Sequence, residues 1–224
     1  MATAPKMSHG RVGAGARAGS RPRRRRAVRR RRSPEQAESE ILAAAESFLR
    51  EHPFRDLQVD QVMARTGLAR PSFYQYFRDR NQLVIRLVER LGAELFPMSE
   101  PWFKGKGNPA ADLRAAYEAI AVGYAKHGLV LRAVADAATQ HPDVERAYRG
   151  FIDRFIHATV TRIRSDIRRG FVPGLEPIGV ATALVWGSER YLSEKLGRLP
   201  QSDPMEVVEV LLTIWTRTLY GVLA

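Results

Sequence analysis

The stretch that most constrains the fold is residues 57–83, LQVDQVMARTGLARPSFYQYFRDRNQL, because it has the pattern of two short helices joined by a tight turn. Val59, Val62 and Met63 are apolar at positions i, i+3 and i+4, so they lie on one helical face. The turn that follows contains Gly67, and glycine can adopt the left-handed conformation that ends a helix. The pattern predicts a helix-turn-helix.

The second short helix is expected from about Arg70 to Phe77. Pro71 falls in its first turn, where no backbone N–H is needed. Phe73 and Phe77 would point into the core, which leaves hydrogen-bonding and aromatic side chains outside, as docking in a DNA major groove requires. These outer residues are Arg70, Ser72, Tyr74, Gln75 and Tyr76. Two helices joined at a glycine also occur in helical proteins that bind no DNA, so the spacing alone leaves both interpretations open.

The excess of positive charge is confined to the start of the chain. The net charge is +12, and 12 of the 36 lysines and arginines lie in residues 1–32, which contain no acidic residue. We expect this arm to be disordered and to follow the DNA backbone or enter a minor groove through an arginine block. The block contains Arg23, Arg24, Arg25 and Arg26. A solvated tail, or residues upstream of a misassigned start codon, are the alternatives, and such a block also suits RNA or an acidic membrane.

Several classes of site are excluded by residue types and motifs. The chain has no cysteine, so disulfides, thiolate metal sites and thiol catalysis are ruled out. The five histidines show no paired spacing, and no catalytic or nucleotide-binding motif is present. His127 is expected to be a cap or surface residue near a helix end. No apolar run suits a membrane span, and no signal peptide is visible. We therefore expect a cytoplasmic protein that is not an enzyme, with no cofactor, metal site or membrane partner.

Caps and apolar stripes predict an all-α chain of about nine helices in two domains after the arm. Ser33-Pro34-Glu35-Gln36 is a capping-box start, and its helix would complete a three-helix DNA-binding domain over residues 33–79. Residues 80–224 would form a helical ligand-binding and dimerisation domain. The first expected helix of this domain starts at Asp79 or Asn81 and ends near Phe96, and a loop is expected over 98–109. The other expected helices cover about 109–124, 129–139, 142–169, 175–196 and 203–224.

Two features of this second domain have more than one interpretation. Trp102 and Phe103, in the expected loop, could cover an opening or dock on the surface. The last helix has one apolar stripe and, through Val208 and Leu212, a second apolar flank, which favours a second partner such as a dimer mate. The stripe consists of Val207, Val210, Leu211, Ile214, Trp215, Thr218 and Leu219.

Aromatic side chains from four expected helices could converge in the second domain. They are Tyr117, Tyr124, Tyr148, Phe151, Phe155, Trp186 and Trp215. A packed core is the commoner explanation of such a set. A ligand cavity needs the same residues together with a few hydrogen-bonding groups, for which Thr159 and Ser188 are available. The residues alone leave both explanations open.

The segment TGLARPSFYQYFRDRNQL resembles the signature of the TetR family of transcriptional regulators: a small residue, Gly, an apolar residue, then an aromatic pair, a Phe and a basic residue three positions later. The resemblance extends from Ser33 to about Leu95. Ala69 departs from the family, which usually has Ser or Thr there as a helix cap worth roughly 1 kcal/mol. Arg80 stands where Lys is usual, and either residue can contact phosphate.

The segments SERYLSEKLG and VVEVLLTIWTRTLYG are similar to the ethionamide-resistance repressor (EthR) subgroup of that family. This resemblance implies a nine-helix fold, a homodimer formed by the last two helices and an apolar ligand tunnel. Val185 and Ser188 stand where the subgroup has side-chain amides, so the same ligand chemistry does not carry over. The proposed ligand-binding residues are Leu113, Tyr117, Ile120, Tyr124, Tyr148, Ile152, Phe155, Thr159, Ser188 and Trp215.

Together, the resemblances imply a ligand-responsive, sequence-specific DNA-binding regulator, most simply a repressor released from double-stranded operator DNA by an apolar small molecule. Arginine can bond guanine bidentately and glutamine can bond adenine. The expected readers of base edges are Arg70, Ser72, Gln75 and Tyr74, next to Pro71, while Tyr76, Arg80 and the arm would hold phosphates. The alternative is a non-specific nucleic-acid-binding protein that acts through its arginine-rich arm.

Overall fold

Eight α-helices and three short 3-10 helices build the part of the chain that this computed structural model describes, residues 33–172 and 174–221, in which there is no strand. The all-α prediction is confirmed. The expectations for the arm concern residues 1–32 and lie outside the described residues. The elements are α1 (Pro34–Glu51), η1 (Phe54–Asp56), α2 (Val59–Ala64), η2 (Arg70–Gln75), α3 (Arg80–Leu95), η3 (Phe96–Ser99), α4 (Glu100–Lys104), α5 (Pro109–Ala138), α6 (Pro142–Arg168), α7 (Pro177–Leu196) and α8 (Pro204–Tyr220).

The helices begin where local capping chemistry places them. Ser33 Oγ accepts a hydrogen bond from the Gln36 amide at 3.2 Å, and Gln36 Oε1 accepts one from the Ser33 amide at 3.1 Å, so the expected capping box is formed. The side chains of Asp79, Asn108 and Asp203 accept hydrogen bonds from first-turn amides of α3, α5 and α8. These side chains satisfy the N–H groups that the first turn of a helix leaves without a partner.

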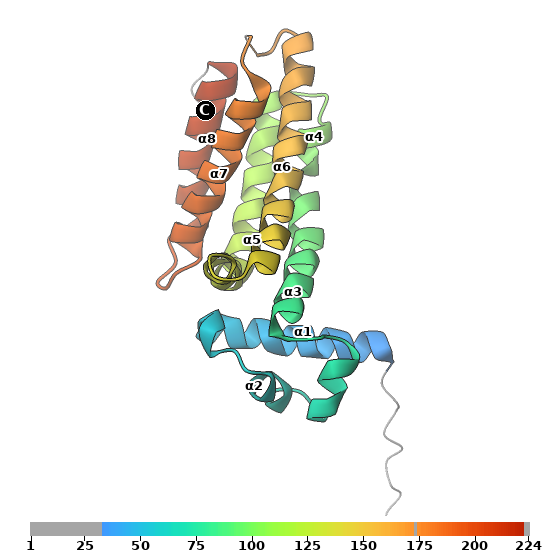
Figure 1. Cartoon of the computed structure of the whole chain (residues 1–224). Helices are drawn as coiled ribbons and strands as arrows, with labels where there is room; N and C mark the ends of the chain where they lie inside the picture. The colour runs from blue at the N-terminus through green and yellow to red at the C-terminus, as the bar shows by residue number, and fades with distance from the viewer. Residues whose placement is uncertain (1–32, 173, 222–224) are drawn as a thin grey trace, which may run out of the picture. The chain divides into compact units, whose positions relative to one another are not determined.

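The helix-turn-helix is formed by α2 and η2; α2 packs against α1 (Figure 1), and η2 packs against α2. Phe73 and Phe77 are buried, as expected, and Phe54 closes the same core. Two details differ from the prediction. Among the described glycines only Gly170 and Gly221 have a positive φ, so the left-handed conformation expected at Gly67 is wrong. The Gly67 amide donates instead to Glu40 Oε1 at 2.7 Å.

The recognition segment η2 is a 3-10 helix and not an α-helix. The Ser72 amide donates to the Ala69 carbonyl at 2.9 Å, and the Tyr76 amide to the Phe73 carbonyl at 3.0 Å, which are i to i−3 bonds. Pro71 supplies no N–H, and Ala69 at the N-cap provides no side-chain acceptor. The missing cap that the sequence indicated is therefore real, and the segment remains in the tighter helical form common for short pieces.

The longest helix, α5, runs for 30 residues and packs against α6, α7 and α8 (Figure 1). The sequence predicted two helices here, with a break before Leu129, and that prediction is wrong. Gly128 lies inside α5 because the backbone of Leu196, at the end of α7, comes so close that a Cβ on residue 128 would be 2.4 Å from the Leu196 oxygen. With η2 counted beside the eight α-helices, the described residues still contain the expected number of about nine.

The segment expected as a loop over residues 98–109 is largely helical. It forms η3 and α4, and only Gly105 to Asn108 connects α4 to α5. Trp102 is 2% exposed. Its ring therefore lies inside the protein, so of the two interpretations for this residue the structure excludes surface docking.

A charged cluster joins α1 and α3 to α5. His127 of α5 is buried, with Nδ1 2.8 Å from Glu46 Oε1 of α1 and Nε2 3.1 Å from Glu94 Oε1 of α3. Arg50 and Arg90 also bind Glu46. The expectation that His127 is a cap or surface residue is wrong, because it lies in the middle of α5, where three helices meet. No helix in the described ranges is long and apolar enough to cross a membrane.

Candidate DNA-binding surface and ligand pocket

The recognition segment presents most of the predicted DNA-binding residues on one outer surface. Arg70, Pro71, Tyr74 and Gln75 are exposed, and Tyr74 is 54% exposed although it is a large ring. Ser72 and Tyr76 are half-buried at the edges of this surface. Phe73 is buried beneath this surface, and its burial determines which face of the recognition segment points outward. The surface therefore combines ring faces with donors and acceptors, which suits base edges and phosphates.

Two arginines at this surface are engaged within the chain. Arg70 Nε is 2.9 Å from Asp60 Oδ1, and both side chains are more than half exposed, so this ion pair contributes little and leaves Arg70 available to DNA. Arg80 Nη1 donates to the carbonyls of Leu57 at 3.1 Å and Arg55 at 3.4 Å, and its guanidinium lies 5.0 Å from the Phe54 ring centroid. Arg80 therefore ties η1 to the start of α3. Arg23, Arg24, Arg25 and Arg26 lie outside the described residues.

An apolar pocket of about 70 Å³ lies among the long helices. Nine of the ten predicted ligand-binding residues line it, and Tyr148 does not. The volume is below the roughly 150 Å³ that holds one benzene ring in an engineered cavity. A ligand larger than a few atoms would therefore have to displace the walls. The lining residues predicted from the sequence are Leu113, Tyr117, Ile120, Tyr124, Ile152, Phe155, Thr159, Ser188 and Trp215.

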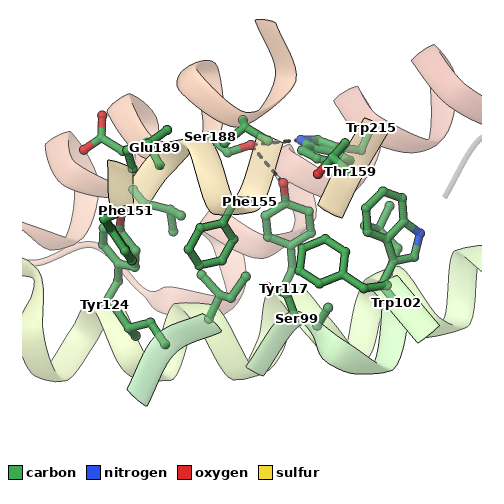
Figure 2. Close-up of a pocket in the computed structure, with 18 residues that line it drawn as sticks. Ser99, Trp102, Tyr117, Tyr124, Phe151, Phe155, Thr159, Ser188, Glu189 and Trp215 are labelled. Carbon is green, nitrogen blue, oxygen red and sulfur yellow. Dashed lines mark hydrogen bonds between the residues drawn. The ribbon is translucent and has the colours of Figure 1, made fainter. Parts of the chain in front are cut away.

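The polar centre of the pocket is already satisfied by the protein itself. Ser188 Oγ accepts a hydrogen bond from Trp215 Nε1 at 2.9 Å and shares a second with the Tyr117 hydroxyl at 2.8 Å (Figure 2). Burial raises the pKa of the Tyr117 hydroxyl, which keeps it a neutral hydrogen-bonding group. Ser188 therefore holds two walls of the pocket together, and it has little capacity left for a ligand.

Nine lining residues are absent from the proposed ligand-binding set. They are Leu95, Ser99, Trp102, Phe103, Ala116, Phe151, Val185, Glu189 and Leu192. Phe151 nevertheless belongs to the converging aromatic set, the resemblance places Val185 at a tunnel position, and Trp102 and Phe103 are the residues considered as a cover. One periodic signal was present: Val185, Ser188, Glu189 and Leu192 follow the i, i+3, i+4, i+7 pattern of a single helical face. Glu189 was overlooked because glutamate is rarely buried without a partner.

Glu189 is the charged group of this pocket and is 8% exposed. The Tyr148 hydroxyl donates to its Oε1 at 2.5 Å, which explains why Tyr148 lies behind the lining and not in it. Burial raises the pKa of the Glu189 carboxyl above its usual value of 4.5, while the Tyr148 hydrogen bond acts in the opposite direction. The pocket is therefore apolar with a single carboxyl group at its boundary.

Two family models match separate stretches of the chain. Residues 41–87 match the family described as bacterial regulatory proteins, tetR family, and residues 113–221 match the one described as transcriptional regulator EthR, C-terminal domain. The HTH-type transcriptional regulator EthR of Mycolicibacterium smegmatis is 29% identical over 210 residues, which is 90% of this chain and 94% of that protein. EthR of Mycobacterium tuberculosis is 28% identical over 206 residues, with the same two coverages.

Solved structures agree in fold. A TetR-like transcriptional regulator from Rhodococcus sp. RHA1 superposes with a TM-score of 0.66 at 20% identity, covering 84% of this chain and 97% of that one. Regulatory protein TetR from Rhodobacter sphaeroides gives 0.63 at 21% identity, covering 81% and 96%. The family matches and the helix-turn-helix geometry lead to one conclusion: the chain belongs to the TetR family of DNA-binding transcriptional regulators and is similar to EthR.

Proposed function

We propose that this protein is a homodimeric repressor that leaves its operator when a small apolar molecule enters the pocket. The observation that carries the proposal is the position of α3. This helix starts at Arg80, directly after the recognition segment, and ends at Leu95, which lines the pocket. One rigid helix therefore extends from the DNA-binding surface to the ligand site, and we place the domain boundary near residue 80, where this helix begins.

Ligand entry would act on α3 through the pocket walls. Because the pocket is small, a ligand would push apart Leu95 and the residues that follow it, Ser99 and Trp102. Glu94, one residue before Leu95, is bonded to His127, which also holds Glu46 of α1. A shift of α3 would therefore move the DNA-binding helices and change the distance between the two recognition segments of a dimer. Operator binding requires that distance to be about 34–36 Å, so binding would weaken.

The support for a dimer through α7 and α8 comes from different residues than those expected. Val208 and Leu212, the expected second flank of the last helix, are buried within the chain itself. Val210 and Ile214, expected to face inward, are 40% and 48% exposed. Exposed apolar residues on one helix face favour a partner, and a second copy of the chain is the one proposed here.

Ile214→Glu is expected to convert the dimer into a monomer, because it places a charge in the apolar centre of the proposed interface. Sedimentation velocity at fixed protein concentration measures the result. Val122→Glu is the matched control, since Val122 is 64% exposed on α5 and lies outside α7 and α8, so this variant should remain dimeric. A dimeric Ile214→Glu protein would remove this face from the interface.

Footprinting on the DNA upstream of the protein's own gene is expected to show a protected palindrome at physiological salt. The measurement compares the full chain with a variant that lacks residues 1–32. The palindrome should persist without the arm, with lower affinity and a flatter dependence on salt, because the arm adds only phosphate contacts.

Two further outcomes test the parts of this proposal. A Gln75→Ala variant should protect a different or less selective set of sequences, and an unchanged preference would exclude Gln75 as a base reader. Protection everywhere that vanishes with the arm would favour the alternative function, non-specific nucleic-acid binding through the arginine block, which carries 12 cations within residues 1–32.

A further inference from the structure

One end of the pocket has a chemistry that the apolar lining does not explain. Glu189, Tyr124 and Phe151 lie at the same end of the row of lining residues, while Trp102 lies at the other end (Figure 2). The carboxyl group of Glu189 is held by the Tyr148 hydroxyl through Oε1 only. Within residues 33–172 and 174–221, Oε2 makes no hydrogen bond and Glu189 forms no salt bridge. Glu189, a lining residue of the pocket, therefore has one carboxylate oxygen that no described residue bonds.

The described residues form no salt bridge with this carboxyl group. Arg190, the next residue on α7, is 65% exposed at its side chain and is bonded to Glu194 at 2.7 Å. Burial is the main cause of the raised pKa of Glu189, and the charge of Arg190 only partly offsets it. An ammonium group that bonds this carboxylate directly would compensate for its burial.

The surroundings of Glu189 are aromatic. Tyr124 and Phe151 line the pocket beside it, and the Tyr148 ring centroid lies 6.3 Å from that of Phe151. Burial, and secondarily the charge of Glu189, raise the pKa of the Tyr124 hydroxyl, which places these two groups within electrostatic reach of each other. A carboxylate among ring faces is an environment that attracts an ammonium group, because each ring face carries partial negative charge.

We propose that the effector of this regulator is an apolar amine whose protonated nitrogen binds Glu189 Oε2 among the rings of Tyr124 and Phe151. The inference rests on the proposed ligand-responsive function and specifies the ligand class of the same pocket. The nitrogen would pair with the carboxylate, and a compact hydrocarbon or aromatic tail would enter the apolar part of the pocket, which Ile120, Ile152 and Phe155 help to line. Ser188 would not serve as the polar anchor, since Tyr117 and Trp215 already occupy it.

Calorimetric titration with three probes of equal size tests the ligand class on the full-length protein without DNA. Phenethylamine, phenethyl alcohol and phenylacetate share a ring and a short chain, and differ in carrying a cation, a neutral hydroxyl or an anion. The amine should bind about tenfold or more tightly than the alcohol, because a hydrogen bond to a charged group is worth about 1.5–3 kcal/mol. The anion should bind most weakly.

Glu189→Gln should lower the affinity for phenethylamine by about tenfold and leave that for phenethyl alcohol within about twofold. Glu194→Gln is the matched control. It removes one negative charge from the same helix, but Glu194 is bonded to Arg132, Arg190 and Arg198 and does not line the pocket. This variant should bind both probes as the unmodified protein does.

The pH dependence gives a second readout. Amine binding requires the charged form of Glu189, whose pKa lies above 4.5, so amine affinity should fall as the pH is lowered through that raised pKa. The other titratable or charged groups near Glu189 are Tyr148 of α6, Tyr124 of α5, and Arg190 and Glu194 of α7. Burial raises the pKa values of Tyr124 and Tyr148, and the hydrogen bond from Arg132 lowers the pKa of Glu194. None of these groups therefore titrates in the pH range in which Glu189 does. Alcohol binding should not change.

Each outcome decides a separate point. Equal binding of amine and alcohol, or an equal loss of both in Glu189→Gln, would overturn the amine assignment and leave the repressor proposal standing. If none of the probes binds, the amine assignment fails, while release from the operator by an apolar molecule of another class is tested separately. Operator footprinting, which needs no ligand, would still decide whether the protein is a sequence-specific DNA-binding protein.

Discussion

Replacing Arg162 with leucine is expected to lower the free energy of unfolding by about 3–5 kcal/mol, because the change leaves a buried carboxylate without its main partner. Arg162 and Asp166 are one turn apart on α6, and their side chains are 2% and 1% exposed. Arg162 Nε donates to Asp166 Oδ2 at 2.7 Å, and Nη1 donates to the carbonyls of Trp102 and Gly105, both at 2.6 Å. One guanidinium thus neutralises an acid and ends α4.

The same network reaches the last helix. The Tyr220 hydroxyl donates to Asp166 Oδ2 and accepts from Trp102 Nε1, both at 3.1 Å. Burial raises the pKa of Tyr220 to about 12, so its proton stays in place over the range in which the protein is handled. Because Trp102 is also a pocket wall, loss of Arg162 should loosen the pocket as well as the fold.

Urea unfolding at fixed protein concentration measures the effect, with Arg149→Leu as the matched control. Arg149 is also on α6 and is also paired four residues away, with Glu145 at 2.9 Å, but its side chain is 63% exposed. That variant should change stability by less than about 1 kcal/mol. Adding Asp166→Leu to Arg162→Leu should recover part of the loss, since the only charge that then loses a partner is the half-buried one of Arg169. A loss in Arg162→Leu no larger than in the control would show that the buried pair contributes nothing.

Gly128→Ala is expected to cost about 1–3 kcal/mol although alanine favours a helix by about 1 kcal/mol over glycine. A Cβ on residue 128 would lie 2.4 Å from the oxygen and 2.8 Å from the carbon of the Leu196 carbonyl group, and 3.1 Å from the Gly197 nitrogen. These are backbone atoms at the end of α7, so they cannot rotate away as a side chain would. The contact of α5 with α7 would have to open.

The Gly150→Ala variant on α6 measures the helical preference of alanine over glycine where the added Cβ causes no clash. No heavy atom lies within 4 Å of a Cβ at residue 150, and the residue is exposed. This variant should gain about 0.5–1 kcal/mol in the free energy of unfolding. The two variants should therefore change stability in opposite directions in thermal or urea unfolding. If Gly128→Ala proves as stable as Gly150→Ala, the close approach of α5 and α7 is wrong.

Features that depend on neighbours in sequence were predictable. Ser33, Asn108 and Asp203 start helices at the expected residues, because a cap acts within one turn. Phe73 and Phe77 are buried because four-residue spacing puts them on the same side of a short segment. The family signature around these two residues led to the helix-turn-helix, which the family matches confirm.

The site was only partly predictable. Spacing and family resemblance brought nine of the expected ligand-binding residues to the pocket, but they included Tyr148 and omitted Glu189. Both residues lie on faces turned to the middle of the bundle. Which of them reaches the cavity depends on the rotation of α6 against α7, and that rotation is set by packing among several helices.

Four features follow from the sequence without the tertiary structure: the helical class, most helix starts, the recognition segment and the confinement of the excess positive charge to residues 1–32. All of these depend on interactions within a few residues. The tertiary structure alone decided that Gly128 lies inside a continuous α5, that His127 lies between Glu46 and Glu94, and that Ile214 faces outward while Leu212 is buried. A helix with two apolar faces can bury either face, and a glycine can lie inside a helix or end it; the local sequence is compatible with each of these arrangements. Only contacts with helices distant in sequence select among these arrangements, because those contacts determine which surface is removed from water.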